Sequence, residues 1–120
     1  MSSPKYATNC VERFLEYVKM DTQSCEDSDT FPSTSTQLDL LGRLQSELQA
    51  LGLEDVTMDD YGYVFATVPA TSAKTGVPVI GFLAHVDTSP EMSGAGVKAI
   101  FHRDYDGRNL VFPDDPSAMI

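Results

Sequence analysis

Residues 77–87 read VPVIGFLAHVD, an almost continuous apolar run from Val77 to Ala84 that leads directly into His85 and Asp87. Such a run is typical of a strand at the centre of a sheet that is covered on both faces, usually a parallel sheet. It is much shorter than the about 20 apolar residues that a membrane-spanning helix needs. We therefore predict that this run is a buried strand of an α/β domain.

Two helical segments are expected before this strand. Apolar residues recur at helical spacing between Thr8 and Met20, with charged residues between them, which predicts an amphipathic helix. Thr34 and Gln37 fit a capping box that begins a second helix, and Gly52 is a typical C-terminal stop. The leucines of the second helix form a stripe that we interpret as core, because it is too short for sustained heptads. They are Leu38, Leu41, Leu44, Leu48 and Leu51.

The pattern then changes to a period of two. Residues 56–58 and 63–67 alternate in character around the turn 59–62, which predicts a β-hairpin. Residues 99–102 and 109–112 are candidates for two short strands. The order of helix, helix, hairpin and buried strand predicts an α/β domain with a mostly parallel central sheet packed by helices. No helix follows the buried strand to cover its second face, so we expect the domain to be incomplete in this chain.

Composition narrows the function classes. The 120 residues include 8 Lys and Arg against 18 Asp and Glu, which gives a net charge of −10. This charge argues against nucleic acid and against a membrane surface as partners, because both are bound by basic patches. Cys10 and Cys25 do not form a C-x-x-C pair and are expected to be free thiols in a reducing compartment. The N-terminus has no uninterrupted apolar segment of a secretory signal, so a cytoplasmic location is expected.

His85 and Asp87 are the candidate site residues. Side chains at positions i and i+2 share one face of a strand, and ligands of open α/β sheets bind at the carboxyl ends of the strands. A neutral imidazole is a good zinc ligand, and its second nitrogen usually donates to a carboxylate. One histidine and one aspartate cannot complete a zinc site, however, which needs three or four protein ligands. These residues alone therefore leave two interpretations open: a metal ligand, or a histidine that makes a structural hydrogen bond.

A family resemblance favours the first interpretation. Residues 82–94, FLAHVDTSPEMSG, resemble the first metal motif of the peptidase T family. These tripeptide aminopeptidases belong to the dinuclear zinc exopeptidases, together with aminoacylase and glutamate carboxypeptidase types. The wider family shares H-x-D, whereas the continuation T-S-P-[DE]-x-S-G is similar to peptidase T in particular. The resemblance extends upstream to residues 12–18, 21–24, 31–34, 51–53 and 62–70.

The resemblance implies a role for each of the two residues. His85 matches a ligand of one of two Zn²⁺ ions, and Asp87 matches the catalytic-site carboxylate that orients this histidine. Residues 1–120 would then be the N-terminal portion of a zinc-exopeptidase catalytic domain. The bridging aspartate, the Glu-Glu pair, the remaining ligands and the lid domain have no match in this chain.

The resemblance thus implies a metal-dependent aminopeptidase that releases the N-terminal residue from tripeptides, with this chain alone inactive. Its expected partner is a small peptide, with no nucleic acid and no membrane, and a homodimer of the full-length form is compatible with it. Two alternatives stay open. The chain is an inactive truncated product or a binding module, or it derives from a related zinc deacylase or carboxypeptidase.

Overall fold

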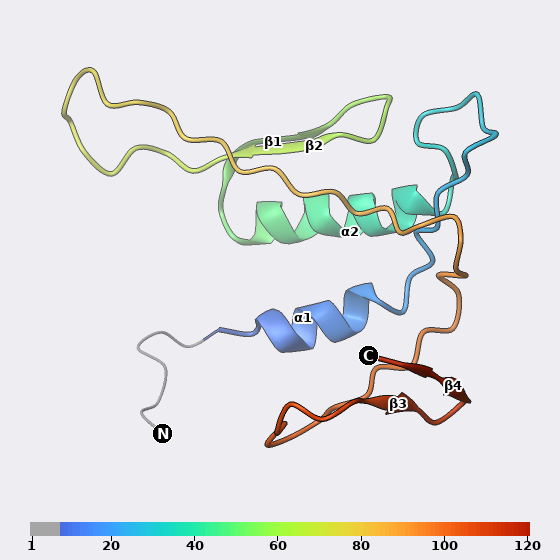
Figure 1. Cartoon of the computed structure of the whole chain (residues 1–120). Helices are drawn as coiled ribbons and strands as arrows, with labels where there is room; N and C mark the ends of the chain where they lie inside the picture. The colour runs from blue at the N-terminus through green and yellow to red at the C-terminus, as the bar shows by residue number, and fades with distance from the viewer. Residues whose placement is uncertain (1–7) are drawn as a thin grey trace.

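The computed structural model describes residues 8–120 (Figure 1). Its elements are α1 (Cys10–Tyr17), α2 (Gln37–Ala50), β1 (Glu54–Met58), β2 (Val64–Thr67), β3 (Val111–Phe112) and β4 (Asp115–Met119). The predicted α/β class is confirmed at this level: the described part of the chain holds two helices and two small antiparallel sheets. The prediction that the N-terminus lacks a secretory signal falls on residues outside this range. Among residues 8–120, no helix is both long and apolar enough to cross a membrane.

Helix α2 forms where the leucine pattern places it, but it begins differently. Its N-cap is Thr36, which makes no side-chain capping bond. The predicted capping box is wrong: the N-cap lies two residues after Thr34, and the Thr34 hydroxyl accepts from the Gln37 side chain at 3.0 Å, not from a backbone amide, while it donates to the carbonyl of Gln23 at 2.8 Å. At the other end Gly52 has φ +75°, the left-handed conformation that favours glycine after a helix. The predicted C-terminal stop is therefore confirmed.

The leucine stripe is only partly buried. Leu41 of the predicted stripe lies in the core together with its neighbour Leu40, whereas Leu38 and Leu51 are exposed. The hairpin β1–β2 packs beside α2 (Figure 1). Its turn approaches the core at Gly62, where an added Cβ would lie 3.0 Å from Leu41 Cδ1. The small core therefore consists of one face of α2 and the tight turn that rests on it.

The predicted hairpin is confirmed as an antiparallel pair, with Met58 opposite Val64 and Thr57 opposite Phe65. In its turn, the Asp59 carboxylate accepts hydrogen bonds from two backbone amides, those of Tyr61 and Tyr63. An aspartate that bonds to the backbone two residues on is a favourable turn residue. Hydrogen bonds between neighbouring residues thus explain why the hairpin turns at residues 59–63.

The structure differs from the prediction at residues 77–84. They form no strand, and Val79, Phe82 and Leu83 are at least 96% exposed. Figure 1 draws this segment as an extended tube without an arrow. A strand needs a neighbour for its backbone hydrogen bonds, and no residue in 8–120 pairs with this segment. The predicted mostly parallel central sheet is accordingly absent from the described residues, in which the only parallel pairing is an isolated bridge between Gln23 and Thr88.

The C-terminal segment forms a second small antiparallel sheet. Strand β3 pairs with β4 through Val111 opposite Met119. The predicted strand at 109–112 is thus confirmed in part, whereas 99–102 has no strand structure. Cys10 and Cys25 are both free, as expected.

Helix α1 has no buried residue. A cluster of polar side chains joins it to α2. The Glu47 carboxylate on α2 pairs with Arg13 of α1 at 2.9 Å and with Arg43 at 2.9 Å, and it accepts a hydrogen bond from the Tyr17 hydroxyl. The Arg43 guanidinium also lies 5.5 Å from the centre of the Tyr17 ring. Two hydrogen bonds lower the pKa of Glu47 below its ordinary value: the one from Tyr17 has the larger effect and the one from Arg43 the next largest.

We expect Glu47→Gln to lower the free energy of unfolding at neutral pH by about 1 kcal/mol. A lowered carboxylate pKa stabilises the fold above the ordinary value, and this contribution is lost as the pH falls through the lowered pKa. The stability of the variant should therefore fall less steeply below pH 4.5, the ordinary value. Urea unfolding at neutral and acidic pH measures both effects. Glu26→Gln in the exposed 25–27 segment is the control, and equal pH profiles of the two variants would contradict the role of Glu47.

Candidate functional site

His85 and Asp87 contact each other directly. The Nδ1 atom of His85 lies 3.1 Å from Asp87 Oδ1 and 3.0 Å from the backbone carbonyl oxygen of Asp87. Both oxygens can only accept, so Nδ1 carries the proton and donates it. The other ring nitrogen, Nε2, then holds the free lone pair. The His85 side chain is 84% exposed, so this lone pair is open to a ligand.

This arrangement fits one metal ligand with its orienting partner. A metal-binding histidine usually donates its second ring nitrogen to a carboxylate or a carbonyl, which sets the tautomer and raises ligand basicity. Within residues 8–120, however, no group of three or more His, Cys, Asp and Glu side chains could hold a metal ion. Zinc sites need at least three protein ligands. The described residues therefore supply part of a metal site, and the other ligands would have to come from elsewhere.

The backbone directly after Asp87 is held by the turn at residues 21–24. The Thr88 amide donates to the Thr22 carbonyl at 3.0 Å, and the Ser24 amide donates to the Thr88 carbonyl at 3.0 Å. The pattern of Asp, Ser and Thr in residues 21–32 predicts a solvated loop. That prediction is wrong for Thr22, which is only 3% exposed because the 88–94 segment covers it.

Sequence reasoning from composition missed Gln23 and Gly94, which lie in this contact. The available signal was the resemblance of residues 21–24 to the peptidase T pattern, which marks this turn as more than a connecting loop. The spacing of Gln23 and Gly94 from His85 carries no periodicity that would join them.

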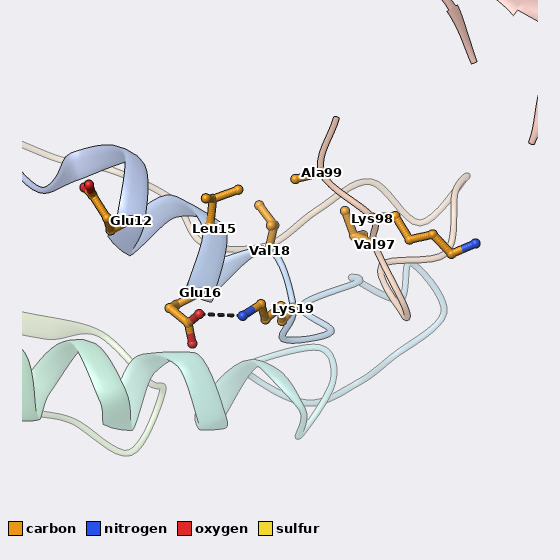
Figure 2. A pocket seen from close by; sticks show the side chains of 8 residues that line it. All are labelled: Glu12, Leu15, Glu16, Val18, Lys19, Val97, Lys98 and Ala99. Carbon is orange, nitrogen blue, oxygen red and sulfur yellow. Dashed lines mark hydrogen bonds and ion pairs between the residues drawn. The ribbon is translucent and has the colours of Figure 1, made fainter. Parts of the chain in front are cut away.

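A separate hollow lies between α1 and residues 97–99 (Figure 2). The side chains of Leu15 and Val18 face this segment, and Glu16 forms an ion pair with Lys19 at its edge. Neither His85 nor Asp87 lines it. The hollow therefore does not form part of the candidate site.

Comparisons with known proteins match the chain to proteins named peptidase T. No family model matches it. It is 46% identical over 110 residues to Peptidase T of Clostridium botulinum, 47% identical over 113 residues to that of Alkaliphilus oremlandii, and 49% identical over 110 residues to that of Clostridium acetobutylicum. These matches cover 92–93% of this chain. The chain is therefore a homologue of peptidase T, and the resemblance found in the sequence is confirmed.

The match is partial in the other direction. The chain spans only 27–28% of the length of these relatives. The chain thus corresponds to a fragment of peptidase T.

Proposed function

We propose that this chain carries the first metal motif of a metal-dependent aminopeptidase that releases the N-terminal residue from tripeptides. His85 would bind one of two zinc ions through Nε2, and Asp87 would hold the proton on Nδ1. One observation carries the proposal: Nδ1 of His85 lies 3.1 Å from Asp87 Oδ1, with Nε2 left exposed. When bound, the metal pair would supply Lewis-acid polarisation of the scissile carbonyl and an activated water.

The remaining parts of the site would belong to the rest of the polypeptide. Coverage of about a quarter of the relatives supports residues 1–120 as one portion of a larger catalytic domain, and the sequence resemblance assigns them to its N-terminal part. The exposed apolar segment 77–84 supports the same view, because it would gain strand neighbours in a larger, mostly parallel sheet. We further propose a cytoplasmic location, which the free cysteines support, and no nucleic acid or membrane partner, which the negative charge supports. A small peptide is the proposed substrate, and a homodimer of the full-length form is compatible with this proposal.

The test is to sequence the coding DNA beyond the codon for Ile120 and to express the complete product. We expect it to hydrolyse tripeptides with a free amino terminus, to lose this activity with a chelator, and to recover it with Zn²⁺. Acylated amino acids and peptides with a blocked amino terminus are the comparison substrates. Faster hydrolysis of these would favour a deacylase or a carboxypeptidase, and no metal-dependent hydrolysis at all would overturn the proposal.

A second candidate function is an inactive product or a binding module. The absence of a three-ligand group in residues 8–120 favours it for the 120-residue chain itself. It predicts weak zinc binding and no tripeptide hydrolysis by this chain. Tight calorimetric binding of two zinc ions by residues 1–120 would contradict it.

A further inference from the structure

The segment that carries His85 is held on one side only. Residues 77–84 precede it with exposed side chains and pair with no strand in the described part of the chain. The residues that follow Asp87 are instead bonded to the 21–24 turn, which lies more than 60 positions earlier in the sequence. The position of His85 therefore depends on what holds residues 88–90.

The bond from Thr88 to Thr22 acts on Asp87 through the peptide group that Asp87 and Thr88 share. The only cis peptide in the described residues lies elsewhere, so this group is trans and planar. In a trans peptide the N–H and the C=O point in opposite directions. The Thr88 amide points to the Thr22 carbonyl at 3.0 Å, and the Asp87 carbonyl consequently points to His85 Nδ1 at 3.0 Å.

Gln23 ties this contact to helix α2. Its side-chain Nε2 donates to the backbone carbonyl of Pro90 at 2.7 Å, and its backbone carbonyl accepts from the Thr34 hydroxyl at 2.8 Å. The side chain of Gln37, 5% exposed in the first turn of α2, donates in turn to Thr34 Oγ1 at 3.0 Å. A continuous hydrogen-bonded path therefore runs from the start of α2 through Gln23 to Pro90.

Gly94 closes the same contact from the other side. It is buried, and an added Cβ would lie 2.6 Å from Asp21 Oδ1 and 3.2 Å from Thr88 Oγ1. The same Asp21 oxygen accepts the backbone N–H of Gln23 at 3.0 Å. A side chain at position 94 would thus push the Asp21 carboxylate away from the amide that it orders.

We propose that the 21–24 turn positions His85 for metal binding, with Gln23 as the positioning residue: it holds residues 88–90 so that the 87–88 peptide group presents its carbonyl to His85 Nδ1. Nε2 is then kept as the nitrogen with the free lone pair. This inference rests on the proposed metal role of His85, but the hydrogen bonding that it describes exists without metal.

The experiment is to measure the tautomer of His85 by ¹⁵N NMR in the metal-free 120-residue chain, at a pH where imidazole is neutral. We expect the Nδ1–H form to predominate in the wild type. Gln23→Glu removes the donor to Pro90 with little change of shape, and Gly94→Ala displaces Asp21. Both should shift the majority to the Nε2–H form that an unconstrained histidine prefers. Asp21→Asn keeps an Oδ1 acceptor and should behave as the wild type.

His102, which lies outside both the 21–24 turn and residues 85–94, is the internal control and should be unchanged in every variant. Unchanged amide chemical shifts of α2 and the hairpin identify the variants that still fold. If Gly94→Ala does not fold, Gln23→Glu alone provides the test. An unchanged His85 tautomer in folded Gln23→Glu, with exchange of the Thr88 amide accelerated, would overturn the inference. Because no metal is present, this result is independent of whether the complete protein is a metallopeptidase.

Discussion

His85→Ala in the complete polypeptide is expected to abolish metal-dependent tripeptide hydrolysis. The substitution removes the nitrogen that we propose as a ligand, and no group of three or more His, Cys, Asp and Glu side chains in residues 8–120 could hold the metal in its place. Asp87→Asn keeps an oxygen near Nδ1 but removes the charge, and loss of such an orienting partner typically costs about 10–100-fold in metal affinity or activity. The loss for His85→Ala should exceed that range.

The measurements are kcat/KM for a tripeptide and the zinc content after dialysis. His102→Gln is the matched control, since it removes the other histidine of this chain and should leave both quantities unchanged. If His85→Ala were as active as His102→Gln, the metal role of His85 would be excluded. A loss of activity with full zinc content would instead assign His85 to substrate binding.

The accuracy of the sequence-based predictions follows the range of the interactions concerned. The hairpin turn at Asp59 and the stop at Gly52 depend on neighbouring residues, and both are as predicted. The capping box also depends on neighbouring residues, but the N-cap is Thr36, and the Thr34 hydroxyl accepts from the Gln37 side chain and not from a backbone amide. Local patterns therefore predicted these elements well, except where a different side-chain hydrogen bond formed in place of the expected one.

In the candidate site, too, the short-range contact could be predicted from the sequence and the long-range contact could not. The contact between His85 and Asp87 spans only two residues, so it forms although the predicted strand does not. The bond from Gln23 to Pro90 spans 67 residues, and no periodicity encodes it. The strand neighbours expected for segment 77–84 are absent from the described residues 8–120, so a pattern typical of a buried strand coexists with an exposed segment.

Segment 77–84 should change from exposed to buried between this chain and the complete polypeptide. Its amides have no strand partner among residues 8–120, so we expect their hydrogen exchange in the 120-residue chain to be close to the rate of an unfolded peptide. In the complete polypeptide the same amides should be among the best protected. Mass spectrometry of peptides that cover these residues measures the difference, and the hairpin β1–β2, paired in this chain, is the internal reference.

Phe82→Lys tests the same change energetically. Phe82 is 96% exposed in the 120-residue chain, so a lysine there should leave its stability almost unchanged. Burying a phenylalanine contributes about 1.5–3 kcal/mol, and burying an unpaired charge adds a further cost. The complete polypeptide should therefore lose at least about 3 kcal/mol of unfolding free energy. Phe101→Lys, outside the apolar run, is the control for the added charge. Equal, small effects of the two substitutions in the complete polypeptide, with fast exchange retained at 77–84, would show that the run is a surface segment and would contradict its burial in a larger sheet.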